Sequence, residues 1–201
     1  MMKKIFTVNK SIAFLAAAAV LTFSACKKEK HDDHDHDHEN ENEEITTVKL
    51  TFTNAATPAE KVIATWKDMD GAGGNAPQIT AISLKANTTY LLATELLDER
   101  KNPADTVTHE IAEEADEHRL FHLFFVNANA PVTDSVTTAA TVTPLDKDGK
   151  NLPVGLDVQV ATKAAFKGYF RMVVRHQPTG KDGSYTPGST DAQAEFPIEI
   201  K

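Results

Sequence analysis

The sequence predicts a mainly β protein: a single antiparallel β-sandwich, immunoglobulin- or fibronectin-like in layout, with one short helix. Apolar and polar residues alternate with a period of two along many short segments, as on strands with one buried face. Asp-Gly and Gly-rich stretches, which favour turns, separate these segments. A repeated strand–helix alternation, which would predict a parallel α/β sheet, does not occur in the sequence.

About nine strands are expected within residues 45–201. The clearest example is the first, in which Val48, Leu50 and Phe52 share one face and the residues between them are polar. Strands this short and this closely spaced are typical of a sandwich. The expected strands cover residues 47–53, 61–67, 79–84, 88–97, 119–126, 135–143, 156–161, 166–175 and 196–200.

Residues 1–25 have the features of a lipoprotein signal peptide. Three lysines precede an apolar run at residues 12–23, which is shorter than the ~20 residues that a membrane-spanning helix needs. The run leads into LTFSAC, which resembles a bacterial lipobox. Because Cys26 is the single cysteine, we expect it to be acylated and to anchor the chain in a lipid bilayer. The next residue is Lys27 and not Asp, which favours the outer membrane, on its periplasmic or its cell-surface face.

Residues 26–44 are expected to form a disordered, acidic tether. After Cys26 they include nine acidic residues and no aliphatic residue, Phe, Tyr or Trp, so they cannot bury enough apolar surface to fold. Imidazole is a good ligand for Zn, Cu and Ni, and a flexible His/Asp run can wrap an ion loosely. The alternative is a solvated spacer; no cofactor is expected to be essential. The expected ligands are His31, His34, His36, His38, Asp33, Asp35 and Asp37.

Residues 45–201 form the predicted sandwich domain, which contains a helix expected over about 105–117. On that helix Glu114 and His118 share a face at i, i+4 spacing. The pattern then changes to a strand, on which His118 and His122 point the same way. A Glu/His/His zinc site at this junction is one expectation. The other is a solvated acidic helix, followed by histidines that pack on a half-buried strand.

The sequence favours a protein that is not an enzyme. The segment that begins at His109 has Glu113 where an HExxH metalloprotease motif needs its second histidine. The full sequence contains no GxSxG motif and no Gly-rich phosphate loop, and its lone cysteine is expected to carry lipid. A net charge of −8 argues against nucleic acid as a partner. Two Asp-Ser/Thr-aliphatic triplets match a bacterial O-glycosylation motif, with Thr106 and Ser135 as the acceptors.

The combination of these features resembles a family of small bacterial surface lipoproteins of unknown function. The resemblance rests on the lipobox, the His/Asp tether and the segments EITTVKLTFT, LKANTTYLLATELLDE, EIAEEADEHRLFHLFF and GYFRMVVRHQP. Members sometimes carry a type 1 periplasmic-binding label, which would imply alternating strands and helices that this sequence does not show. The resemblance therefore implies location and a single domain. An outer-membrane transporter is one expected partner; the alternative is that the chain is an accessory subunit of a nutrient receptor that recognises a protein or glycan.

Overall fold

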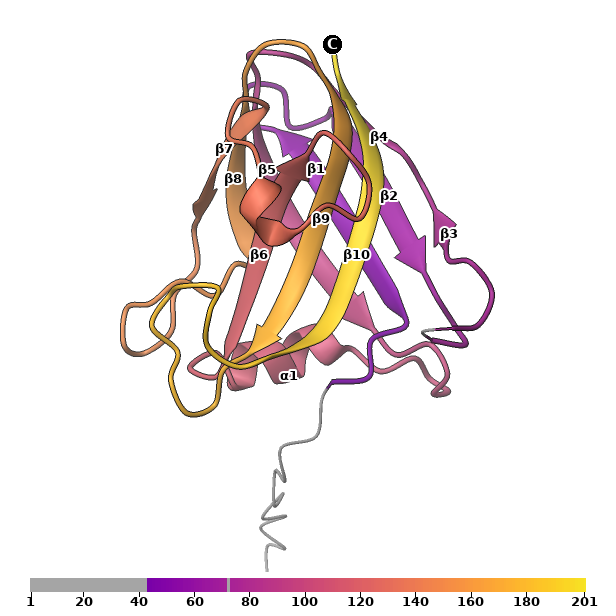
Figure 1. Ribbon diagram of the computed structural model, residues 1–201, viewed down its shortest axis with the longest axis vertical. Helices are drawn as coiled ribbons and strands as arrows, with labels where there is room; N and C mark the ends of the chain where they lie inside the picture. Colours follow the sequence, from indigo (N-terminus) through magenta and orange to yellow (C-terminus); the bar gives the residue numbers. More distant parts are fainter. Residues whose placement is uncertain (1–42, 72) are drawn as a thin grey trace, which may run out of the picture. The chain divides into compact units, whose positions relative to one another are not determined.

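The computed structural model describes residues 43–71 and 73–201. Two β-sheets and a single α-helix enclose one apolar core (Figure 1). Strands make up 47% of the described residues and helices 6%, which confirms the predicted β-sandwich with one short α-helix. The predicted signal peptide, the lipidation site Cys26 and all four tether histidines lie outside the described residues.

The larger sheet has six strands in the order β3-β2-β1-β5-β8-β7, and all neighbours are antiparallel. Its strands are β1 (Thr47–Asn54), β2 (Lys61–Lys67), β3 (Gln78–Ile79), β5 (Thr89–Leu97), β7 (Ala140–Pro144) and β8 (Asp157–Thr162).

The smaller sheet has four strands in the order β4-β10-β9-β6. They are β4 (Ile82–Leu84), β6 (His118–Phe125), β9 (Phe166–His176) and β10 (Ser189–Ile200). Within the described residues, β4 and β10 form the one parallel strand pair, and all other strand pairs are antiparallel.

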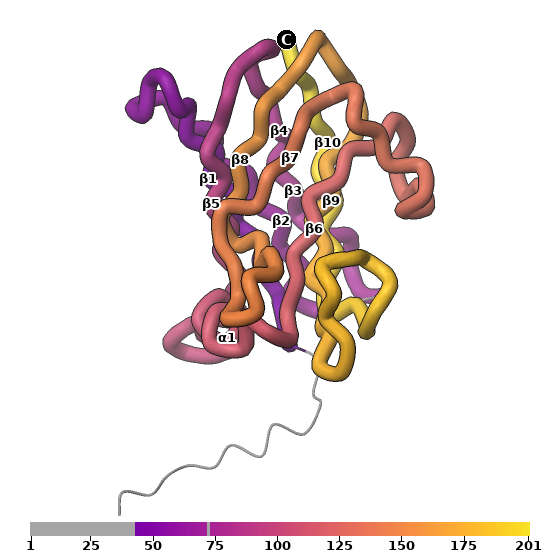
Figure 2. Tube along the Cα trace, turned by 90° about the vertical axis from the view of Figure 1, so that its left-hand side faces the viewer, coloured from indigo at the N-terminus to yellow at the C-terminus, as the bar shows by residue number. Residues whose placement is uncertain are grey.

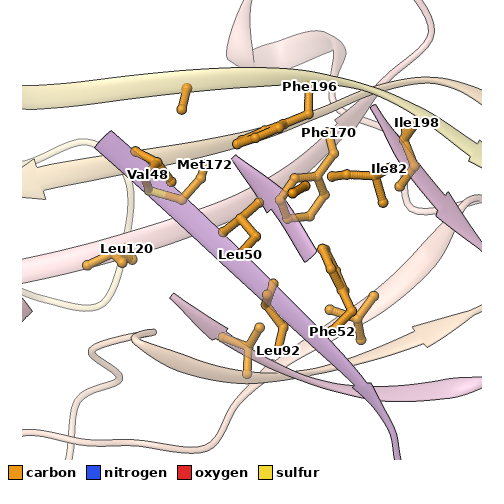
Figure 3. Packing of buried hydrophobic residues seen from close by; sticks show 14 of the residues in the cluster. Val48, Leu50, Phe52, Ile82, Leu92, Leu120, Phe170, Met172, Phe196 and Ile198 are labelled. Carbon is orange, nitrogen blue, oxygen red and sulfur yellow. The ribbon is translucent and has the colours of Figure 1, made fainter. Parts of the chain in front are cut away.

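The core lies between the two sheets, as the alternation predicts. Val48, Leu50 and Phe52 of β1 are fully buried and face side chains of the smaller sheet (Figure 3). Phe170 of β9 is at the centre of an aromatic group, with its ring centroid 5.8 Å from Phe52 and 5.2 Å from Phe124. Burying each such side chain stabilises the fold by about 1.5–3 kcal/mol.

Three expected strands differ clearly from the structure. The strand expected over 79–84 is two strands, β3 and β4, which belong to different sheets. Residues 135–139 do not form a strand: a 3₁₀ turn, η1 (Val132–Asp134), comes before them and β7 starts at Ala140. Strand β10 starts seven residues before the expected 196, because its polar first half hides the alternation.

Helix α1 (Val107–Glu113) is shorter than predicted and buries Val107 and Ile111. It lies at one end of the sandwich, and both views place it at the same end as the loop between β9 and β10 (Figures 1 and 2). Only four residues separate it from β6, so the helix end is next to the first residue of that strand. Candidate metal ligands gather at this end of the fold.

Candidate metal centre

Three adjacent strands bring His118, His176 and Asp191 together. One ligand atom from each side chain lies within 4.8 Å of the others. His118 begins β6 and His176 ends β9, and the two residues are direct partners across this antiparallel ladder. Their imidazole rings stack with centroids 4.7 Å apart. The strand register therefore creates a histidine pair from residues that are far apart in the sequence.

A β-bulge directs Asp191 towards this pair. Along the β9–β10 ladder Thr190 pairs with Arg175 and Ala192 pairs with Val174, so Asp191 is the extra residue. Bulges reorient a side chain relative to a regular strand. The Asp191 side chain is 0% exposed, and its Oδ2 lies 3.7 Å from His118 Nε2.

The facing atoms of this cluster are buried without partners. His118 Nε2 and both carboxylate oxygens of Asp191 have no hydrogen bond within the described part of the chain. A buried polar atom that makes no hydrogen bond costs about 1–3 kcal/mol, and a buried carboxylate costs more. A cation bound between these atoms would satisfy all of them at once.

The protonation states suit metal binding. Burial, together with the neighbouring His176, lowers the pKa of His118 to about 4, so this imidazole is neutral at physiological pH. Burial raises the pKa of Asp191 to about 6. Metal ions bind neutral imidazole and ionised carboxylate, and a bound cation stabilises the ionised form.

The segment between α1 and β6 orients the two histidines. The Glu114 carbonyl oxygen lies 3.3 Å from His118 Nδ1, and the Glu114 carboxylate lies 3.8 Å from the same nitrogen. The tautomer with its proton on Nδ1 donates to Glu114 and leaves the Nε2 lone pair directed towards Asp191. The Glu117 carboxylate lies 3.5 Å from His176 Nε2. Such partners behind a ligating histidine fix its tautomer and its ring orientation.

The surroundings of the cluster are negative. Glu43, Glu114 and His118 form a second group of ligand atoms within 4.8 Å. Burial raises the pKa of Glu43 to about 8, with further contributions from a hydrogen bond to Glu110 and from the charges of Glu110, Glu114 and Asp191. A divalent cation would relieve the repulsion among these carboxyl groups.

A nearby lysine does not neutralise this charge, because it is engaged elsewhere. The Lys181 ammonium donates to the Ala115 carbonyl at 2.7 Å and pairs with the Asp148 carboxylate at 2.9 Å. Both of these paired side chains are at most 1% exposed.

The geometry fits a four-coordinate ion after a small contraction. Zinc bonds of 2.0–2.2 Å in a tetrahedron place neighbouring ligand atoms roughly 3.4 Å apart. The ligand atoms of His118, His176 and Asp191 are separated by up to 4.8 Å. An ion would therefore draw these side chains about 1 Å closer together.

Of the folded-domain ligands expected from sequence, the structure brings Glu114 and His118 together but not His122. A strand advances about 3.3 Å per residue, so His122 lies roughly 13 Å farther along β6. Its Nε2 is 3.3 Å from Thr94 Oγ1, and its ring packs against Phe170. The expected convergence of these three residues is thus wrong, and His122 is a buried core histidine.

His176, Asp191 and Glu43 are the cluster members that sequence reasoning missed. His176 continues the buried alternation of Met172 and Val174, so extending strand 166–175 by one residue would have found it. Asp191 carries no comparable signal, because a bulge does not follow the strand period.

The two candidate glycosylation residues lie away from regular strands. Thr106 is half-buried at the N-cap of α1, and Ser135 is exposed directly after η1.

Comparisons with protein-family models, with curated protein sequences and with solved structures find no match for this chain. Among residues 43–71 and 73–201, no helix has the length and apolar character to cross a membrane.

Proposed function

We propose that this protein is a non-enzymatic lipoprotein that binds a transition-metal ion, preferably zinc, in a buried site formed by His118, His176 and Asp191. The observation that carries the proposal is that ligand atoms of His118 and Asp191 are buried without hydrogen-bond partners in the described part of the chain, with His176 beside them. Two imidazoles and a carboxylate are ligands that zinc accepts.

The burial of this site favours binding over catalysis. The exposed fraction of the His118 side chain is 1%, and that of Asp191 is 0%. A catalytic zinc site keeps one position open to substrate or water. Ligands this deeply enclosed leave little room for a substrate.

The tether and anchor give this site a cellular role. Acylation of Cys26 would hold the domain at the outer membrane, and the tether histidines would loosely collect Zn, Cu or Ni nearby. The support for both is the sequence: one cysteine at a lipobox-like motif, followed by a His/Asp-rich run. The collected ions would be available to the buried site and to a partner transporter.

Calorimetric titration with zinc tests the proposal. We expect one tighter class of site from the domain and a weaker class from the tether. Asp191→Asn should remove the tighter class, and replacement of His31, His34, His36 and His38 by Asn should remove the weaker one. Asp182→Asn, which changes an exposed aspartate in the β9–β10 loop, is the matched control. If Asp191→Asn binds zinc as tightly as Asp182→Asn does, the domain site does not exist.

A further inference from the structure

We infer that Glu43, which joins the tether to the sandwich, supplies the fourth ligand of this ion, so that metal binding fastens the start of the domain to strands β6, β9 and β10. The inference rests on the proposed metal site and names the residue that closes it.

Glu43 shares His118 with the three expected ligands. Its carboxylate forms a group with Glu114 and His118 in which one ligand atom of each lies within 4.8 Å of the others. The charge of Asp191 also acts on the Glu43 carboxylate. The side chain is therefore close to His118, feels the charge of Asp191 and is half-buried.

Glu43 is better placed than Glu114 for this role. The carbonyl and the carboxylate of Glu114 both approach His118 from its Nδ1 side. The ion must lie on the Nε2 side, where Asp191 is 3.7 Å away. Glu114 thus orients the imidazole from its Nδ1 side, so the fourth position falls to Glu43, the other carboxylate of that group.

The charge balance of the site favours a second carboxylate over water. A divalent ion with two neutral imidazoles and one carboxylate has a net charge of +1, which is costly in a buried site. The Glu43 carboxylate would bring the net charge to zero. Four protein ligands also match the closed coordination of structural zinc sites.

Within the described residues, backbone hydrogen bonds begin at Thr46, so the segment before it can shift to close the site. Thr46 donates its backbone N–H to the Leu97 carbonyl at 2.9 Å, which joins the chain to β5. Glu43 lies three residues before this bond, outside any described strand. A metal–carboxylate bond at Glu43 would hold this short segment to the smaller sheet, which contains β6, β9 and β10.

The test uses the full chain with His31, His34, His36 and His38 replaced by Asn, so that zinc binding reports only the domain. In this background Glu43→Gln should weaken zinc binding about tenfold or more, the range reported for altered metal sites. Zinc should slow amide exchange at Glu44 and Ile45 in the background chain and leave it unchanged in Glu43→Gln. Cobalt should give visible bands in the background chain, and these bands should shift in Glu43→Gln, because water would then take the fourth position.

Glu44→Gln is the matched control, because Glu44 is the adjacent exposed glutamate and pairs with Arg100 instead. It should keep the zinc affinity, the exchange protection and the cobalt bands of the background chain. Equal affinity and exchange in Glu43→Gln and Glu44→Gln would overturn the role of Glu43 while the metal site stands. Two zinc ions per chain would also overturn it, because Glu43 and Glu114 would then hold a separate ion. Failure of the proposed function has another signature: no zinc binding in the background chain itself.

Discussion

His118 and His176 stack across the β6–β9 ladder with their rings 8° from parallel. The nitrogen lone pairs of an imidazole lie in the plane of its ring. Because these two ring planes are nearly parallel, the lone pairs of the two histidines do not converge on one point. At least one imidazole must therefore turn about its side-chain torsion before both can bind one ion. The observed arrangement of the two rings is therefore close to the geometry that the proposed ion needs but not identical to it.

We expect zinc to raise the thermal unfolding midpoint of the wild-type protein. Free zinc at about 100 times Kd should stabilise the fold by about 2.7 kcal/mol, because only the folded chain holds the complete site. Differential scanning calorimetry measures the shift, which a chelator should reverse. Asp191→Asn should lose the shift, whereas Asp182→Asn should keep it. An equal shift in both variants would mean that the stabilising ion binds elsewhere.

His122 should make the fold sensitive to acid. Burial, together with repulsion from Arg119, lowers its pKa to about 3. Between pH 6.5 and about 3 the unfolded chain therefore binds a proton that the folded chain does not, and stability falls as the pH falls.

Removal of the titrating group should reduce this sensitivity. His122→Leu should flatten the loss of unfolding free energy between about pH 7 and pH 4 by up to about 3 kcal/mol, since each pKa unit is worth about 1.4 kcal/mol. Urea unfolding at a series of pH values gives the slope. His109→Leu, at an exposed histidine of α1, should keep the wild-type slope. Parallel curves for wild type and His122→Leu would contradict the prediction.

Two buried arginines should respond in opposite ways to the same substitution. Arg119 is 8% exposed, and its Nε and Nη1 have no hydrogen-bond partner within the described residues. Arg171 is 2% exposed, but it donates to the Glu195 carboxylate and to the Ala130 carbonyl.

Arg119→Met should therefore raise the free energy of unfolding by about 1 kcal/mol, because it removes buried donors that lack hydrogen bonds and keeps the apolar stem. Arg171→Met should lower it by about 3 kcal/mol, because it leaves Glu195 without its partner. Denaturant unfolding of both variants provides the comparison. A destabilised Arg119→Met protein would show that this guanidinium is satisfied in solution.

Gly188 should tolerate no side chain. It has a φ of +78°, and an added Cβ would lie 1.8 Å from the His176 carbonyl oxygen. Gly188→Ala should cost more than about 2 kcal/mol and weaken zinc binding, because the backbone of a metal ligand must move. Gly183, with a φ of +83° and only ordinary 3.7 Å contacts to Leu152 and Pro153 at its Cβ position, is the control. Gly183→Ala should cost only about 1 kcal/mol. Equal losses in calorimetry would point to the backbone angle alone.

The period-two alternation is enough to predict which residues form the core. Val48, Leu50 and Phe52 are buried as predicted, and so is the inward face of β9. Alternation assigns a residue to a face, but it does not say which strand lies beside it. The pairing of His118 with His176 depends on register, which is set by packing across the whole sheet.

The candidate site was harder to predict than the core. Glu114 and His118 are local neighbours, so helical spacing found them, whereas Asp191 enters through a bulge in a segment whose polar residues resemble a loop. His122 was misplaced for a different reason. Strand spacing predicts its direction correctly, but four residues along a strand cover too much distance for two side chains to share an ion.

The bulge at Asp191 makes the site separable from the scaffold. On both sides of this residue β9 and β10 pair in regular antiparallel fashion. A three-nucleotide deletion that removes Asp191 would leave two strands able to align without interruption, and with them an intact sandwich. In evolution, the proposed metal centre could be gained or lost by a single codon.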